Sequence, residues 1–226
     1  MDAVKKQVKD LLKSENSGHG YDHIERVYLL AKQFSINQDV DQELIELIAL
    51  LHDVDDYKLV GSKNRETFYH AKRIMKECNV NVQKQQDILE ALQTIGYSKR
   101  LKGIVPQTLE AKTVSDADMC DAIGVHGILR TFQYSLNQGN VFFDRNRFPD
   151  EKMNYEKYVA NKSDTSIEHI FIKLLKLKDL MLTPEGKIEA FKRHSIMVDI
   201  LYHYFEEEGA SEWTNYLNQY LKAEDK

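Results

Sequence analysis

Three short segments of this sequence carry side chains whose types and spacing could do chemistry. They are GHGYDHIERV, ALLHDVDDYK and SDADMCDAIG, and each contains imidazole or carboxylate groups close together. These groups are His19 and His23 in the first segment, His52 and Asp53 in the second, and Asp116, Asp118 and Asp121 in the third. A mixed set of His and Asp suits Mn²⁺, Fe²⁺, Ni²⁺, Zn²⁺ or Mg²⁺ and leaves positions for water and substrate.

The setting of the second segment favours a metal over a solvated surface pair. The run Leu44–Leu51 repeats apolar residues at i, i+3, i+4 and i+7, which predicts an amphipathic helix over residues 41–53. This helix brings His52 and Asp53 into or beside the core. An unpaired carboxylate there is costly, so it needs a cationic partner or a metal. The same reasoning applies to Asp118, which lies in a helical segment with apolar neighbours.

The remaining pattern is helical almost throughout, so the predicted fold class is all-α. The chain has three prolines, and the alternation typical of strands is hard to find. Thr165 and Thr183 are predicted N-caps, Gly209 a helix stop, and Gly124 and Gly127 a bend or close backbone approach. A break is predicted at residues 96–106. The predicted helices are 2–16, 20–36, 41–53, 64–78, 84–95, 108–137, 165–181, 184–208 and one from 211.

One stretch, residues 139–163, is rich in aromatic and charged residues but has no clean period. A long irregular stretch of this kind is either a lid or binding insertion, or a surface excursion packed by its own aromatics. Phe142, Phe143 and Tyr155 would stack on a base in the first case and pack in the second. No internal repeat is evident, so we expect a single domain over residues 1–226 that includes this insertion.

Composition restricts the classes of function. The chain of 226 residues has a net charge of −5, with 42% hydrophobic and 30% charged residues. These values are typical of a globular protein and argue against binding to nucleic-acid polymers or membranes. Cys78 and Cys120 form no CxxC pair, and no apolar signal peptide or membrane span is visible. We therefore expect a cytoplasmic protein. The glycine motifs of P-loop and Rossmann nucleotide sites are absent.

Together the three segments resemble one family. His23, the pair His52–Asp53 and Asp118 follow the order of the H…HD…D signature of the HD-domain metal-dependent phosphohydrolase superfamily. Within this superfamily, the sequence most resembles the YedJ/YpgQ-like branch. The segments that carry this resemblance are HGYDHIERV, LLHDVDDYKL, SDADMCDAIGVHGILRTF and HIFIKLLKLKDLMLTPEGK. The resemblance spans roughly residues 17–208 and implies an all-α HD-domain helical bundle.

The resemblance also implies a site and a reaction. The metal ligands would be His23, His52, Asp53 and Asp118, with Asp118 favoured over Asp116 by alignment of the motif. Manganese is the expected metal, and Mg²⁺, Ni²⁺, Fe²⁺ and Zn²⁺ are compatible. The expected activity is that of a (deoxy)nucleoside triphosphate pyrophosphohydrolase, which releases the monophosphate and pyrophosphate.

Three alternatives stay open beside this activity. The protein could be a nucleotidase or phosphomonoesterase that acts on small nucleotides. It could be an HD-type di-iron oxygenase, which would need further ligands such as Asp22 or His70. It could also be a nucleotide-sensing module without activity, although an intact set of four ligands argues against that.

Three residues near the ligands are candidates for catalysis: His19, Arg26 and Asp56. Arg26 lies one helical turn after His23 and would reach a phosphate or a ligand carboxylate, or form a structural salt bridge. Asp56 would orient or deprotonate the attacking water, or would hold Lys58. His19 would contact phosphate or form a hydrogen bond at the helix start.

Cations are also needed to neutralise a triphosphate. Arg130 and Lys173 lie in apolar helical contexts, so they and Lys58 are predicted phosphate contacts. His169, one turn before Lys173, is predicted to join them. The alternative is that these side chains extend to solvent.

The expected partner is a small-molecule nucleotide, with no nucleic-acid polymer and no membrane. Trp213, Tyr216 and Tyr220 near the C-terminus would cover either a core or a second subunit. A monomer and a homodimer are therefore both compatible with the sequence.

Overall fold

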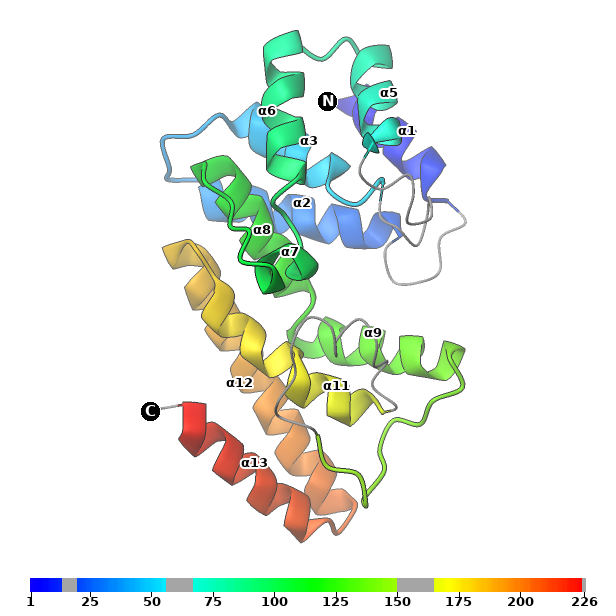
Figure 1. Ribbon diagram of the computed structural model, residues 1–226, viewed down its shortest axis with the longest axis vertical. Helices are drawn as coiled ribbons and strands as arrows, with labels where there is room; N and C mark the ends of the chain where they lie inside the picture. Colours follow the sequence, from blue (N-terminus) through cyan, green and yellow to red (C-terminus); the bar gives the residue numbers. More distant parts are fainter. Residues whose placement is uncertain (14–19, 56–66, 150–164, 225–226) are drawn as a thin grey trace. The chain divides into compact units, whose positions relative to one another are not determined.

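The structure is a computed structural model that describes residues 1–13, 20–55, 67–149 and 165–224 (Figure 1). In these ranges the chain is helical and has no strand, only an isolated bridge between Val141 and Thr165. The all-α prediction is confirmed. The helices are α1 (Asp2–Leu11), α2 (Tyr21–Ser35), α3 (Gln42–Leu51), α5 (Tyr69–Glu77), α6 (Val82–Leu92), α7 (Tyr97–Leu101), α8 (Leu109–Asp121), α9 (Gly124–Asn137), α11 (Ser166–Ile172), the 3₁₀ helix η2 (Leu174–Leu180), α12 (Pro184–Glu207) and α13 (Ser211–Glu224).

The chain divides into two compact units. Unit 1 comprises Met1–Asp121 and Leu180–Lys187, and unit 2 comprises Ala122–Asp179 and Ile188–Lys226. That residues 1–226 form one domain stays a prediction. Among the described residues, no helix combines the length and the apolar character needed to cross a membrane.

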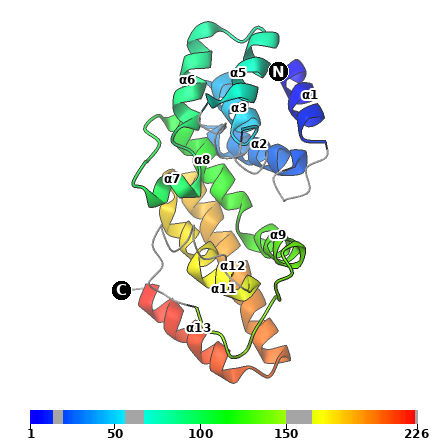
Figure 2. The ribbon, with the colours of Figure 1, turned by 45° about the vertical axis from the view of Figure 1, so that its right-hand side comes forward.

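Unit 1 is built around α2, which packs against α3 and α8. Figures 1 and 2 both show these three helices side by side. Ile24 and Val27 of α2, Ile45 of α3 and Val114 of α8 are fully buried in this unit. Burying one such side chain contributes about 1.5–3 kcal/mol, so packing of apolar faces fixes the helices that carry the candidate ligands.

Unit 2 has an aromatic core centred on Trp213, which is fully buried. The Trp213 ring stacks on Phe148, with centroids 4.4 Å apart, and meets Phe143 edge-to-face at 5.1 Å. Its indole N–H donates to the carbonyl oxygen of Arg145 at 2.9 Å. Trp213 therefore covers a core. The described part of the predicted insertion packs by its aromatics, whereas Tyr155 lies outside the described residues.

Two predicted helix starts are confirmed by side-chain caps. The hydroxyl oxygen of Thr165 accepts a hydrogen bond from the backbone N–H of Glu168 at 3.0 Å. The hydroxyl oxygen of Thr183 accepts one from the backbone N–H of Gly186, also at 3.0 Å. The predicted helix 108–137 is interrupted after Asp121. At Gly127 a Cβ would lie 2.3 Å from the carbonyl oxygen of Ala122, so the predicted close backbone approach requires glycine.

Two further predictions of secondary structure differ from the structure. The helix expected over 165–181 ends at Ile172, and the 3₁₀ helix η2 follows it. With three residues per turn, η2 places Leu174 and Leu177 on one face, and both are buried. The break expected at residues 96–106 contains the short helix α7, whose five residues have too little apolar periodicity to be recognised.

Candidate metal centre

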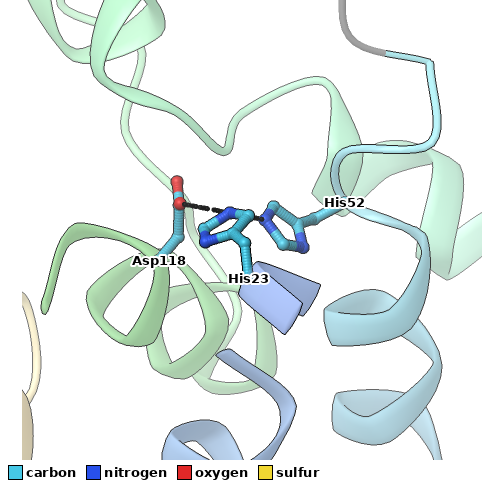
Figure 3. Close-up of side chains that lie close together, drawn as sticks. All are labelled: His23, His52 and Asp118. Carbon is cyan, nitrogen blue, oxygen red and sulfur yellow. Dashed lines mark hydrogen bonds and ion pairs between the residues drawn. The ribbon is translucent and has the colours of Figure 1, made fainter. Parts of the chain in front are cut away.

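Three side chains from separate helices point toward one another in unit 1 (Figure 3). His23 comes from the first turn of α2, His52 follows the last residue of α3, and Asp118 lies in α8. One potential ligand atom from each lies within 4.8 Å of the other two, and His23 is fully buried. The packing of α2 on α3 and α8 therefore brings together groups that are far apart in the sequence.

The Nε2 atom of His23 is the centre of this cluster. It lies 3.2 Å from Nε2 of His52 and 3.6 Å from a carboxylate oxygen of both Asp53 and Asp118. Nε2 of His52 lies 3.8 Å from the same Asp118 oxygen. Atoms that bind one ion at about 2.1 Å lie roughly 3–4 Å from one another. His23, His52 and Asp118 have this spacing to one another, and Asp53 has it to His23.

Hydrogen bonds on the far side of each ring determine which nitrogen faces the cluster. His52 Nδ1 lies 2.8 Å from the carbonyl oxygen of Ala49. Because a carbonyl can only accept, His52 carries a proton on Nδ1. His23 Nδ1 lies 2.6 Å from the carboxylate of Asp121, which is also an acceptor. Both Nε2 atoms therefore present lone pairs to the centre when the rings are neutral.

Two lone pairs that face each other at 3.2 Å repel, so this arrangement favours a cation. Burial alone would lower the pKa of His52, but the carboxylates of Asp53 and Asp118 outweigh it and raise the pKa. The charge pattern that attracts a proton also attracts a divalent ion. Two imidazole nitrogens and two carboxylates are a suitable donor set for Mn²⁺, Fe²⁺, Ni²⁺ or Zn²⁺. The residues present fit a metal.

Comparisons with known proteins agree with this geometry. The HD domain family matches residues 20–123, a range that contains all four candidate ligands. A solved structure from Lactobacillus plantarum is 31% identical in sequence, covers 95% of this chain and 96% of its own, and has a TM-score of 0.77. The chain belongs to the HD-domain superfamily. It is an HD-superfamily hydrolase, of the metal-dependent phosphohydrolase type.

Other members of the superfamily are similar over nearly the whole chain. An HD-superfamily hydrolase from Bacillus thuringiensis is 30% identical, with a TM-score of 0.71 over 92% of this chain and 96% of its own. YpgQ of Bacillus subtilis is 28% identical over 199 residues, which are 88% of each chain. A structure of YpgQ in complex with ADP shares the fold, with a TM-score of 0.68 over 91% of this chain and 96% of its own at 24% identity.

Asp116, the alternative ligand in α8 of this HD domain, has a different partner. Its carboxylate accepts from the backbone N–H groups of Leu182 and Thr183 and from the Thr183 hydroxyl, at 2.7–3.0 Å. Burial raises the pKa of Asp116, and these hydrogen bonds oppose the rise. A Cβ on Gly186 would lie 2.3 Å from the Asp116 carboxylate. Asp116 therefore fixes the start of α12, and Asp118 is the aspartate at the cluster.

Asp55, which follows the HD pair, is bound to the start of α5. It is nearly buried, and its two oxygens accept from the backbone N–H groups of His70 and Ala71, both at 2.9 Å. These donors belong to the first turn of α5, whose N–H groups have no partner inside the helix. The residue two positions after Asp53 is thereby anchored to a helix.

The sequence places Asp121 in the third segment without giving it a role, and the structure brings its carboxylate against His23. Asp121 is fully buried between His23 and Arg26. Its carboxylate stays ionised because the guanidinium of Arg26 compensates the negative charge. Burial would raise the pKa of Asp121, but His23 and Arg26 hold it far below its usual range. Two signals could have identified it: Asp118 and Asp121 share a helix face at i, i+3, and a ligating histidine needs an acceptor on its second nitrogen.

The structure describes only some of the other predicted site residues. His19, Asp56 and Lys58 lie outside the described residues. Arg26 binds the carboxylates of Asp22 and Asp121. These contacts match the structural salt bridge that was one of its predicted roles. Arg130 in α9, His169 in α11 and Lys173 after it belong to unit 2, where each is half-buried and takes part in interactions. Their contact with phosphate stays a prediction.

Proposed function

We propose that this chain is a nucleotide pyrophosphohydrolase that uses a divalent metal, with manganese as the preferred ion. It would act on nucleoside or deoxynucleoside triphosphates. Water adds to the α-phosphorus, the bond from this phosphorus to the bridging oxygen breaks, and the products are a monophosphate, pyrophosphate and a proton.

The observation that carries the metal-dependent part is the pair of Nε2 atoms 3.2 Å apart, beside the carboxylates of Asp53 and Asp118. His23, His52, Asp53 and Asp118 would hold the ion. When bound, the ion would neutralise phosphate charge and activate water for attack at phosphorus. The side chains of Asp53 and Asp118 are 16% and 22% exposed, while His23 is fully buried. The carboxylates therefore line the side that substrate can approach.

The nucleotide part rests on a relative. YpgQ of Bacillus subtilis has been solved in complex with ADP, and this chain is 28% identical to YpgQ over 88% of its length. ADP presents a base, a ribose and a diphosphate, so its binding to a relative supports a nucleotide as the substrate class. We propose Lys58, Arg130, His169 and Lys173 as contacts for the phosphates, and Asp56 and His19 as groups that orient the attacking water or a phosphate oxygen.

The test is release of pyrophosphate and orthophosphate from a panel of nucleoside and deoxynucleoside tri-, di- and monophosphates. The assay compares Mn²⁺, Mg²⁺ and a chelator, and compares the wild type with His52→Ala and Asp118→Ala. His203→Ala, which removes an exposed histidine beside Glu206, is the matched control and should keep full activity.

Pyrophosphate release that needs the metal and is lost in both site variants would support the proposal. Orthophosphate release from monophosphates would replace it with a nucleotidase. Bound metal without turnover of any nucleotide would overturn it and favour the oxygenase or the sensor.

A further inference from the structure

We infer that Asp121, held in place by Arg26, is a positioning residue that sets His23 as a metal ligand through Nε2. The inference deepens the proposed function and rests on it for the metal. It also gives a role to Arg26, for which the sequence allowed a contact with phosphate, a contact with a ligand carboxylate or a structural salt bridge.

The contacts around Asp121 use both of its oxygens. Oδ2 lies 2.6 Å from His23 Nδ1 and accepts from Arg26 Nη2 at 3.1 Å, and Oδ1 accepts from Arg26 Nε at 2.6 Å. Asp121 and His23 are both fully buried. A buried carboxylate is tolerated when a cation and hydrogen bonds compensate its charge, and the forked contact with a guanidinium supplies both.

This arrangement decides where the proton of His23 lies. An ionised carboxylate can only accept, so Nδ1 of His23 must carry a proton and Nε2 is left with its lone pair toward the cluster. The contact also orients the ring and makes Nε2 a stronger donor to a metal, as carboxylates behind ligating histidines do. His52 differs, because its Nδ1 donates to the backbone carbonyl of Ala49. A side-chain substitution can therefore alter the support of His23 but not that of His52.

Arg26 is committed to this support. Its Nε and Nη2 donate to Asp121, and its Nη1 donates to Asp22 at 2.9 Å. All three guanidinium nitrogens thus have carboxylate partners. Burial would lower the pKa of Arg26, but Asp121 and Asp22 raise it, which is the behaviour of a structural cation. Arg26 therefore acts on the metal site through Asp121.

The first test measures Mn²⁺ affinity by titration against a competing chelator. Asp121→Asn should weaken Mn²⁺ binding about 10- to 100-fold, the usual cost of losing such a partner. Glu46→Gln is the matched control, because Glu46 also accepts from two side chains in unit 1, but these belong to Tyr28 and Lys32, which are not candidate ligands. It should leave the affinity unchanged. Equal affinities in Asp121→Asn and the wild type would overturn the inference.

The second test needs no metal and no turnover. NMR of the metal-free protein with ¹⁵N-labelled histidine should show a strongly deshielded Nδ1 proton on His23 that exchanges slowly with water. The signal should be lost in Asp121→Asn and kept in Glu46→Gln. A His23 ring with no proton on Nδ1 in the wild type would overturn the inference. If the wild type binds no metal, the proposed function fails, while this measurement still decides whether Asp121 fixes the proton of His23 on Nδ1.

Kinetics distinguish positioning from substrate binding at Arg26. Arg26→Gln should weaken Mn²⁺ binding while KM for the nucleotide, measured at saturating Mn²⁺, stays at the wild-type value. Arg26→Lys keeps the charge but loses the forked contact with Asp121. Its Mn²⁺ affinity should lie between those of the wild type and Arg26→Gln. A rise in KM at saturating Mn²⁺, with unchanged Mn²⁺ affinity, would assign Arg26 to the substrate and overturn its positioning role.

Discussion

The Nε2 atoms of His23 and His52 lie 3.2 Å apart, and the opposite nitrogen of each ring faces a hydrogen-bond acceptor. When both rings are neutral, the two lone pairs are therefore held against each other by the fold of unit 1. An ion bound between them relieves this repulsion, so binding should stabilise the folded state.

Metal should raise the melting temperature. A ligand at 100 times its Kd stabilises by about 2.7 kcal/mol, and a protein of this size gains about 2–4 °C per kcal/mol. Calorimetry should therefore show an upward shift of roughly 5–10 °C on adding Mn²⁺ at that concentration, reversed by chelator. His52→Ala should lose the shift and the exposed His203→Ala should keep it. The same shift in His52→Ala would place the ion at another site.

Asp118 and Asp116 should behave differently although they are two residues apart. Asp118→Ala removes a carboxylate 3.6 Å from His23 Nε2, so it should abolish Mn²⁺ binding with little effect on unfolding. Asp116→Ala leaves the N–H groups of Leu182 and Thr183 without their acceptor, which should lower the free energy of unfolding by about 1–3 kcal/mol. Its Mn²⁺ affinity should stay at the wild-type value. Urea unfolding and metal titration of both variants check this pair. Loss of Mn²⁺ binding in Asp116→Ala and loss of stability in Asp118→Ala would reverse the roles given to the two aspartates.

Much of the fold follows from local signals. Apolar periodicity indicated most of the helices, and hydroxyl caps at Thr165 and Thr183 marked two starts because their geometry depends on the next three residues. The ligands could be proposed because His52 and Asp53 directly follow an apolar helix. Features that depend on distant packing were harder to predict. The 3₁₀ turn of η2 follows from burial of its leucines, which periodicity over seven residues does not reveal.

The role of Arg26 shows most clearly what the sequence alone could not predict. From the sequence, a cation one turn after His23 suits a phosphate or a carboxylate equally well. Its partner Asp121 is 95 residues away, and only the packing of α2 on α8 decides between them. Spacing within one segment thus identified the groups able to do chemistry, and tertiary structure determined which group each one meets.

Asp55 should contribute to stability as a helix cap supplied from outside the helix. Asp55→Ala would leave two N–H groups at the start of α5 without their partner, which should cost about 1–3 kcal/mol in the free energy of unfolding. Asp55→Asn keeps one acceptor oxygen and should recover part of the loss. Urea unfolding followed by circular dichroism measures both. Equal stabilities of the alanine variant and the wild type would show that the cap is not needed.

Trp213 should be essential to unit 2. Its ring is fully buried against Phe143 and Phe148, and its N–H donates to the carbonyl of Arg145. Trp213→Ala should destabilise the protein by about 3–5 kcal/mol, as for other large core aromatics. Trp213→Phe keeps most of the apolar packing but removes the hydrogen bond, so it should cost about 1 kcal/mol.

The same variants decide between the two roles that the sequence allowed for this aromatic residue. If Trp213 completes a core, both substitutions lower the urea midpoint, the alanine more than the phenylalanine, and light scattering gives the same molar mass as for the wild type. If it covers a partner subunit instead, Trp213→Ala would lower the molar mass and leave the unfolding midpoint of the monomer unchanged. Full burial of the ring by residues of its own unit favours the first result.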